Sequence, residues 1–263
     1  MRTTIDERRV LRISEPSVDL TAAPCYPHRM FSPLVDLVFP PVCALCQRRL
    51  PVPHDPICQP CQRAMAWSLP PYCRRCGASL AGAHDADAEC SGCALRPPAF
   101  ERAVAPLQYR GLVRQAVHAF KYQHRRRIGA WLAARMAQTA QQTWDGEQID
   151  AVVPVPMHWL KARARGDNPA DSLARHVATL LQRPLTRGLL RRRRWTPSQT
   201  RLSPAARARN VAGAFGVARR AQPPTTLLLV DDVFTSGSTA DACALALREA
   251  GASRVLVLSA ARA

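Results

Sequence analysis

The C-terminal two thirds of the chain alternates short apolar runs with longer stretches in which apolar residues recur every three or four positions. The short runs predict buried strands over residues 103–109, 149–155, 225–230 and 254–259. The longer stretches predict helices over residues 111–122, 128–142, 169–181 and 238–250. Strands that alternate with helices imply a largely parallel sheet covered by helices on both sides. We therefore predict an α/β fold for this part of the chain.

The N-terminal third follows neither pattern. Residues 1–29 carry scattered charges and no continuous apolar stretch, which predicts a disordered leader up to residue 30, with Met30 as an alternative start. Cysteine knuckles fill residues 31–96 and stop at Pro97, where we place the boundary to the α/β domain, residues 97–263. The sequence has no run of about 18 apolar residues that would span a bilayer, so we expect a soluble protein.

Eight of the ten cysteines form four Cys-x-x-Cys knuckles, separated by eleven, eleven and thirteen residues. Two knuckles supply four thiolates, so this spacing predicts two structural Zn²⁺ sites. The simpler pairing is sequential, and a cross-braced pairing stays open as the alternative. A disulfide framework is disfavoured because the sequence shows no export signal. The predicted ligands are Cys43, Cys46, Cys58 and Cys61 for one ion, and Cys73, Cys76, Cys90 and Cys93 for the other.

The knuckle segment contains few large apolar residues, so we expect its folding energy to come largely from metal. Four thiolates leave no open coordination position for a substrate, which indicates a structural role. Gly77 follows the third knuckle, where a sharp turn is expected. His54 and His84 are expected to be loop residues, and Cys243 a small apolar residue of a helix.

The net charge of +18 favours an anionic partner. Arginine supplies nearly all the positive charge, since Lys occurs only at positions 121 and 161. Residues 157–220 hold fifteen basic side chains and two acids, and residues 191–194 are an unbroken arginine block. Phosphates, nucleic acid and an anionic membrane face all fit this distribution.

The predicted strand over residues 225–230 runs into two adjacent acids and then into a hydroxyl-rich loop at the start of a helix. Ligands of parallel sheets bind beyond the carboxyl ends of the strands, which is where this loop lies. Backbone N–H groups, hydroxyls and a helix N-terminus suit a phosphate monoester. Asp231 and Asp232 repel that phosphate, so they need ribose hydroxyls, Mg²⁺ or both. We therefore predict a sugar-phosphate site whose anion-binding residues are Thr235, Ser236, Gly237, Ser238 and Thr239.

Residues 227–239 resemble the phosphoribosyl pyrophosphate signature of type I phosphoribosyltransferases. Zinc knuckles followed by such a domain resemble the ComF/GntX family of competence-associated phosphoribosyltransferase-like proteins, over roughly residues 31–263. The second loop reads Arg-Gly-Asp-Asn-Pro over residues 165–169, where family members usually read Arg-Gly-Phe-Asn-Gln. The other segments that agree with the family are Pro154-Val155-Pro156, residues 163–168, Gln199, Leu202, Arg207, Asn210 and Phe215.

The resemblance implies a type I phosphoribosyltransferase-like parallel sheet that binds phosphoribosyl pyrophosphate together with Mg²⁺. It places the ribose 5-phosphate on Asp231, Asp232 and residues 235–239, and it places Gly166 in the loop on the pyrophosphate side. Residues 199–210 would form a mobile hood over the site.

If the protein is an enzyme, pyrophosphate leaves C1 of the ribose while Mg²⁺ and arginines stabilise its negative charge. Arg163 and Arg165 are the candidates for that role, and Lys161 is a weaker one. Thr235 stands where enzymes that use a base on a purine ring carry a carboxylate, so we do not expect a 6-oxopurine acceptor. The acceptor must be a second substrate that the sequence does not identify.

The alternative is a binding protein without catalytic activity, in which the zinc module and the arginine-rich segment contact single-stranded DNA. Trp159 and Trp195 would then stack on bases, and the sugar-phosphate site would act as a sensor. The expected partners are phosphoribosyl pyrophosphate and, in this alternative, single-stranded DNA and a DNA-uptake or helicase-like protein. Thiol-rich metal sites without an export signal place the protein in the cytoplasm, at the inner membrane face if it serves an uptake machine.

Overall fold

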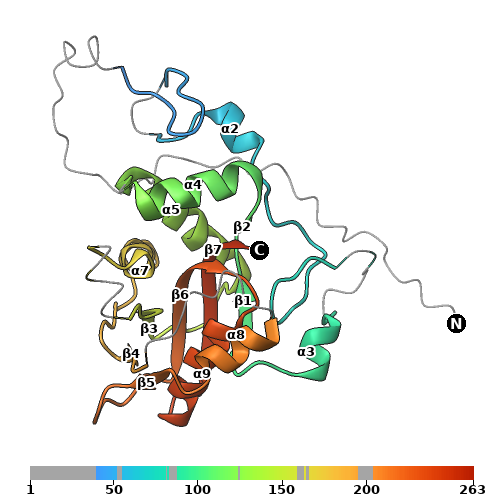
Figure 1. Cartoon of the computed structure of the whole chain (residues 1–263), viewed down its shortest axis with the longest axis vertical. Coiled ribbons are helices and arrows are strands. Elements are labelled where there is room, and N and C mark those ends of the chain that lie inside the picture. Colours follow the sequence, from blue (N-terminus) through green and yellow to red (C-terminus); the bar gives the residue numbers. More distant parts are fainter. Residues whose placement is uncertain are drawn as a thin grey trace, which may run out of the picture.

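The structure of the chain, a computed structural model, describes residues 40–51, 55–80, 82, 88–123, 125–158, 163, 166–194 and 204–263. Figure 1 shows the cysteine-rich segment running along the top and one side of an α/β body. The leader predicted for residues 1–30 lies outside the described residues, and so do His54, His84, Trp159 and Trp195.

A parallel sheet forms the centre of the molecule (Figure 1). Its order is β1-β7-β6-β3, and β2 also pairs with β7. The strand predicted over residues 103–109 is split in two at Pro106, whose nitrogen has no hydrogen to donate to the ladder. The strand bounds are β1 Arg102–Val104, β2 Leu107–Gln108, β3 Ala151–Pro154, β6 Thr226–Phe234 and β7 Arg254–Arg262.

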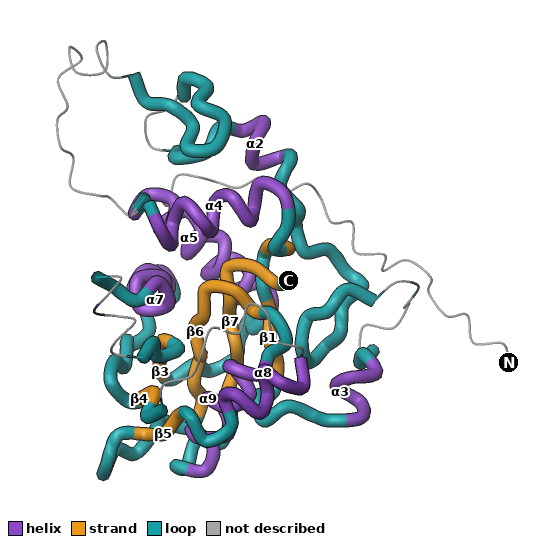
Figure 2. The backbone as a smooth tube through the Cα atoms, in the orientation of Figure 1, coloured by secondary structure: helices purple, strands orange, loops and turns teal. Residues whose placement is uncertain are grey.

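Helices cover both faces of this sheet, as predicted (Figure 2). On β6, Leu228 and Val230 pack in the cluster that contains α4, α5 and α7, whereas Leu227 and Leu229 pack in the cluster that contains α9. This alternation follows from the two-residue period of a strand, and it explains the continuous apolar run of a strand buried on both faces. The helix bounds are α4 Gly111–Tyr122, α5 Arg126–Thr143, α7 Pro169–Leu180, α8 Pro204–Val211 and α9 Ser238–Glu249.

Three elements of the α/β domain were not predicted as regular structure. Strands β4 (Leu190–Arg192) and β5 (Phe215–Val217) form an antiparallel pair beside the main sheet, and helix α8 lies between them in sequence. Strand β4 was not predicted because it lies in the arginine block, whose charged side chains show no alternation of apolar and polar positions. The segment forms a strand because it pairs with β5, although its own residues do not alternate as a strand's usually do.

The described residues of the cysteine-rich segment form two ribbons, within residues 40–67 and residues 68–96, which carry the short helices α2 (Gln59–Arg63) and α3 (Ser91–Leu95). The first ribbon shares a core with α4 and α5, in which Ile57 and Met65 are buried. The second ribbon lies against β1, where the Ala103 amide donates to the Arg75 carbonyl at 2.6 Å. The boundary at residue 97 stays a prediction.

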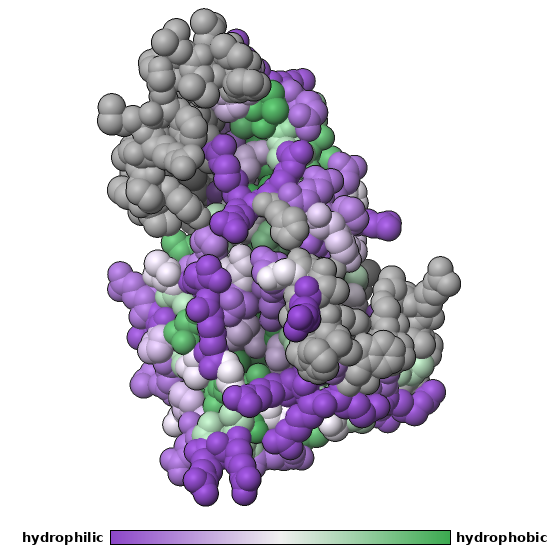
Figure 3. Space-filling model, turned by 60° about the vertical axis from the view of Figure 1, so that its left-hand side comes forward, coloured by the Kyte–Doolittle hydropathy of each residue, from purple (hydrophilic) through white to green (hydrophobic). Residues whose placement is uncertain are grey.

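The described surface is mainly polar. Figure 3 shows hydrophilic side chains over most of the coloured part of one face, with small green areas between them. Among the described residues, no helix is both long and apolar enough to cross a membrane. This surface agrees with the charge balance of the sequence, which favours anionic ligands over large apolar partners.

Candidate functional site

The acid pair lies at the carboxyl end of β6, within the strand. β6 was predicted to end at Val230, but it continues through Asp231 and Asp232 to Phe234. Asp231 and Asp232 are both partly buried, and the Asp231 Oδ1 accepts a hydrogen bond from the Asp232 amide at 2.8 Å. The strand therefore fixes the backbone beneath both carboxylates, at the edge of the sheet where ligands of parallel sheets bind.

Lys121 is a site residue that the sequence reasoning did not single out. It lies in the last turn of α4, and its Nζ is 2.7 Å from Asp232 Oδ1, with both side chains less than one fifth exposed. Although burial opposes ionisation, Asp232 and Asp231 raise the pKa of Lys121. The only available signal was that Lys occurs at two positions of a chain that otherwise uses arginine. The acid pair thus carries an internal counter-ion.

Asp231 lies in a less favourable environment for a charge. Burial and the neighbouring Asp232 raise the pKa of Asp231 to about 7, against the lowering influence of the Asp232 amide, Lys121 and Arg192. Arg192 comes from β4 and packs its guanidinium 5.3 Å from the ring centre of Phe215. One cation from α4 and one from the β4–β5 pair therefore act on the acids. A ligand that donates hydrogen bonds to Asp231 would find an acceptor that is costly to leave unpaired.

The hydroxyl-rich loop follows β6 directly and ends at α9. Gly237 adopts a left-handed backbone with φ of 78° at the N-cap position, and α9 begins at Ser238. The Ser236 and Ser238 hydroxyl oxygens are 2.9 Å apart. A Cβ atom at position 237 would lie 2.7 Å from Cζ of Phe234, so both φ and the close approach of that ring require glycine. The twelve-residue helix α9 turns its N-terminal amides and its positive dipole end toward this loop.

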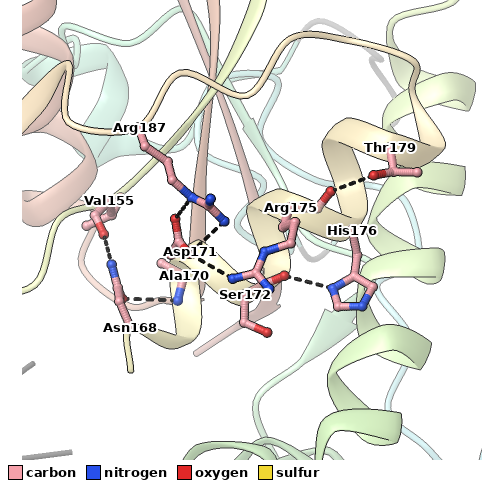
Figure 4. A network of polar contacts seen from close by, with 9 residues as sticks. All are labelled: Val155, Asn168, Ala170, Asp171, Ser172, Arg175, His176, Thr179 and Arg187. Atoms are coloured by element: carbon pink, nitrogen blue, oxygen red, sulfur yellow. Dashed lines mark hydrogen bonds and ion pairs between the residues drawn. The ribbon is translucent and has the colours of Figure 1, made fainter. Parts of the chain in front are cut away.

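A second loop at the same edge of the sheet follows β3. Figure 4 shows Asn168 between this loop and α7: its side-chain amide donates to the Val155 carbonyl at 3.0 Å, and its Oδ1 accepts from the Ala170 amide at 3.2 Å. Pro169 occupies the first helical turn, where a backbone N–H is not needed. The departure from the family pattern at this proline therefore gives a well-capped helix start.

The arginines predicted for the second loop are only partly described. Arg163 is exposed, whereas Arg165 and Lys161 lie outside the described residues. The acid at the start of α7, Asp171, is paired with Arg187 at 2.7 Å and with Arg175 at 3.3 Å (Figure 4). Its negative charge is therefore offset locally.

The arginine block lies on the β4–β5 pair, where it contacts backbone carbonyls. Arg193 donates to the Val217 carbonyl at 2.9 Å, and Arg194 donates to the carbonyls of Asn210 and Ala212. Arg191, Arg193 and Arg194 remain exposed, so their charges still face solvent. These arginines both hold the β4–β5 pair in place and present positive charge.

The eight knuckle cysteines form two clusters, and in each cluster the sulfur atoms lie within 4.8 Å of one another. The pairing is sequential, as the simpler prediction had it: Cys43, Cys46, Cys58 and Cys61 form one cluster, and Cys73, Cys76, Cys90 and Cys93 form the other.

These clusters fit Zn²⁺. Tetrahedral Zn–S bonds of about 2.3 Å require sulfur atoms about 3.8 Å apart. The sulfurs of Cys46 and Cys58 are 3.5 Å apart, and those of Cys76 and Cys90 are 3.7 Å apart. Although burial opposes it, amides that include that of Cys58 at 3.4 Å lower the pKa of Cys43 to about 6, whereas burial raises the pKa of Cys58 and of Cys61 in the same cluster. Both clusters are structural zinc sites.

Comparisons with known proteins agree with this architecture. Residues 34–94 match the family described as "Double zinc ribbon domain". The chain is 29% identical to Competence protein F of Haemophilus influenzae over 179 residues, which covers 66% of this chain and 78% of that protein. It is 32% identical to the DNA utilization protein YhgH of Salmonella typhimurium over 171 residues, which covers 64% of this chain and 75% of that protein.

A solved structure described as the allosteric regulatory enzyme of purine biosynthesis overlaps 55% of this chain and 30% of its own, with a TM-score of 0.37 and 21% identity.

Proposed function

Since this chain belongs to the family of Competence protein F and the DNA utilization protein YhgH, we propose that it binds phosphoribosyl pyrophosphate and works in DNA uptake or utilization. One observation carries the ligand assignment. β6 delivers two carboxylates directly before a loop of hydroxyls and a left-handed glycine at the N-terminus of α9. A phosphorylated sugar offers hydroxyls to the acids and an anion to the loop, so it satisfies both halves of the site.

In this proposal each part of the site contacts one part of the ligand. The 5-phosphate lies in the loop of residues 235–239, where Gly237 allows the backbone to turn its amides toward it. The ribose hydroxyls donate to Asp231 and Asp232. The Lys121 ammonium group pairs with Asp232 at 2.7 Å and serves as its counter-ion while the sugar is absent.

Mg²⁺ fits this site as a companion of the ligand. Protein sites usually hold Mg²⁺ through one or two carboxylates together with substrate phosphates. Asp231 and Asp232 supply two carboxylates, and the described residues bring no third acid, histidine or cysteine into that cluster. Asp231 and Asp232 would therefore hold Mg²⁺, which would supply positive charge for the pyrophosphate leaving group.

The proposed reaction is a pentosyl transfer. The bond between C1 of the ribose and the pyrophosphate oxygen breaks, its electron pair stays on the pyrophosphate, and a nucleophilic atom of a second substrate bonds to C1. Arg163 and Arg165 would stabilise the pyrophosphate as its charge develops. Binding of phosphoribosyl pyrophosphate does not require that this transfer occur.

Calorimetric titration with phosphoribosyl pyrophosphate and Mg²⁺ tests the binding proposal. We expect saturable binding by the zinc-loaded wild type, and at least about tenfold weaker binding by Asp231→Ala and Asp232→Ala, since each loses a charged hydrogen-bond acceptor. Asp171→Ala is the matched control, because that acid lies on α7 and pairs with arginines. Equal affinity in all four proteins would refute the ligand assignment.

A separate assay distinguishes an enzyme from a binder. Pyrophosphate release is measured while nitrogenous acceptors are screened at saturating phosphoribosyl pyrophosphate. Release that depends on one acceptor and is lost in Asp232→Ala would establish transfer. Binding without release across all acceptor classes would favour a non-catalytic role.

The charge of the β4–β5 pair supports the alternative, a scaffold or single-stranded-DNA-binding protein with a sugar-phosphate sensor. The exposed guanidinium groups of Arg191, Arg193 and Arg194 would contact phosphates without regard to sequence, with strong salt dependence. DNA binding that survives Asp231→Ala but is lost when all three arginines become Gln would place DNA at a separate site. We propose a cytoplasmic location, at the inner membrane face if an uptake or helicase-like partner is engaged.

A further inference from the structure

Arg262 lies at the last position of β7, between the second zinc site and the strand that leads to the phosphate loop. Its Nη1 donates to the Cys76 carbonyl at 2.6 Å, and its Nη2 is 3.6 Å from the Cys76 sulfur. A guanidinium that donates to a metal-bound thiolate both orients that ligand and balances its charge. Arg262 is therefore an outer partner of the second zinc site, although it is far from the knuckles in sequence.

The same guanidinium also contacts β6. Arg262 is paired with Phe234 in the sheet register, and its guanidinium carbon is 4.9 Å from the ring centre of Phe234. The Ala263 amide donates to the Phe234 carbonyl at 2.9 Å. The Phe234 ring also meets Phe100 edge to face, with the ring centres 5.8 Å apart. The Phe234 ring is thus in contact with both Arg262 and Phe100.

The Phe234 ring in turn restricts the backbone of the loop at Gly237. A Cβ at Gly237 would meet this ring at 2.7 Å, so the backbone of the loop lies directly on it. A continuous set of contacts therefore runs from the Cys76 sulfur through Arg262 and Phe234 to Gly237. Every step is a direct contact, and the last step lies at the turn that would receive the phosphate.

We propose that Arg262 is a positioning residue that couples the second zinc site to the phosphate loop, so that zinc in this site holds the loop ready for its ligand. The coupling must work in both directions, because two bound species that stabilise one arrangement stabilise each other. The second ribbon then has a defined purpose, which is to fix the edge of the sheet at which the loop lies. The zinc step of this inference stands on the two described cysteine clusters, and only its ligand step rests on the proposed function.

Two substitutions on one strand test the coupling in the intact, zinc-loaded protein. Arg262→Met keeps the aliphatic stem and removes the guanidinium. Arg254→Met is the matched control, because Arg254 begins the same strand and pairs with Glu101 and Glu147 at the opposite end. Arg262→Lys keeps the charge but cannot reproduce the flat fork that contacts both Cys76 and Phe234. It serves as the second variant if Arg262→Met does not fold.

The first readout is zinc release to a chromophoric chelator. We expect the second site to release zinc about 10-fold to 100-fold faster in Arg262→Met, as is typical when an outer partner of a ligand is lost. The first zinc site of the same molecule is an internal reference that should not change. Equal release from the second site in Arg262→Met and Arg254→Met would overturn the contact with the zinc site.

The second readout is hydrogen exchange without any ligand. We expect the Asp241 amide, which donates to the Gly237 carbonyl, to exchange at least about tenfold faster in Arg262→Met than in Arg254→Met. Unchanged exchange at this amide would overturn the link to the loop.

The third readout adds ribose 5-phosphate. It should slow zinc release from the second site of the wild type, and it should not do so in Arg262→Met. Ribose 5-phosphate that binds the wild type but leaves its zinc release unchanged would overturn the reciprocal coupling. If ribose 5-phosphate does not bind the wild type at all, the proposed function fails, whereas the first two readouts still decide the role of Arg262.

Discussion

The two zinc ribbons make the same local turn but attach to the α/β domain in different ways. In each, the amide four residues after the first cysteine donates to the carbonyl of that cysteine, from Gln47 to Cys43 and from Gly77 to Cys73. Both turn residues have a positive φ, 60° at Gln47 and 67° at Gly77. A Cβ at Gly77 would lie 2.9 Å from the Ala103 carbonyl oxygen. The second ribbon therefore requires glycine because of where it lies against β1, and the first does not.

Because of this difference, we expect the first ribbon to contribute mainly to stability and the second to contribute also to the geometry of the ligand site. The first ribbon attaches mainly through apolar side chains, including Ile57 and the edge-to-face contact of Trp67 with Trp131 at 6.4 Å, and also through the Gln108 amide, which donates to the Ala66 carbonyl at 2.8 Å. The second attaches through backbone hydrogen bonds and through Arg262, at the edge that carries the acids and the hydroxyl loop. We expect damage to the first ribbon to lower the free energy of unfolding, and damage to the second to change ligand binding as well.

The largest effect is expected from a substitution that weakens the apolar contact between the first ribbon and the α/β domain. Ile57 is fully buried, so Ile57→Ala should lower the free energy of unfolding by about 2–5 kcal/mol, from lost burial and the remaining cavity. Denaturation followed by tryptophan fluorescence measures this change. Zinc release from the second site should keep its wild-type rate at temperatures where the variant is folded. A change below about 1 kcal/mol would show that the first ribbon is not part of the core.

A somewhat smaller effect is expected at the turn of the second ribbon. Gly77→Ala combines a left-handed backbone with a close approach to a backbone oxygen, so we expect a loss of about 2–3 kcal/mol. Affinity for phosphoribosyl pyrophosphate should fall in the same variant, because β1 and the loop edge shift together. Calorimetry measures both quantities, and a fully wild-type affinity would contradict the distinction between the ribbons.

A pH-dependent change in the free energy of unfolding is expected from Asp231, at the edge of the sheet that carries the loop. Folded Asp231 binds its proton more tightly than the unfolded chain, since its pKa is raised from 3.8 to about 7. Stability is therefore lost as pH rises between these two values. Asp231→Asn removes this loss, so its advantage over the wild type should grow by about 1 kcal/mol from about pH 6 to pH 8. Lower pH is avoided because thiolates release zinc there. A pH-independent difference would exclude the raised pKa.

The smallest effect is expected at Gln47, the turn residue of the first ribbon that corresponds to Gly77 of the second. Gln47→Gly relieves a positive φ without removing a contact with the α/β domain, so it should raise the stability of the ribbon by about 0.5–1 kcal/mol or leave it unchanged. Thermal denaturation of the zinc-loaded protein measures this. A loss as large as that of Gly77→Ala would mean that the two turns are equally constrained by their surroundings.

The sequence predicted the features that neighbouring residues determine, and it missed the residues that reach the site only through the order of the strands in the sheet. Cysteine spacing gave both zinc sites, and the apolar run before Asp231 placed the acids at a strand end. Lys121 and Arg262 reach the site only because α4 ends beside β6 and β7 lies next to it in the sheet. No short pattern marks such residues. The pairing of the knuckles stayed open for the same reason, because spacing alone permits sequential and interleaved arrangements.

The most direct test of the account is the binding of ribose 5-phosphate, which carries both the sugar and the phosphate but lacks pyrophosphate. Titrated into the zinc-loaded protein, it should bind at one site and compete with phosphoribosyl pyrophosphate. Gly237→Ala should weaken this binding at least about tenfold, since the phosphate loop then has no strain-free conformation. Wild-type affinity in Gly237→Ala, or displacement of phosphoribosyl pyrophosphate by pyrophosphate but not by ribose 5-phosphate, would contradict the proposed site.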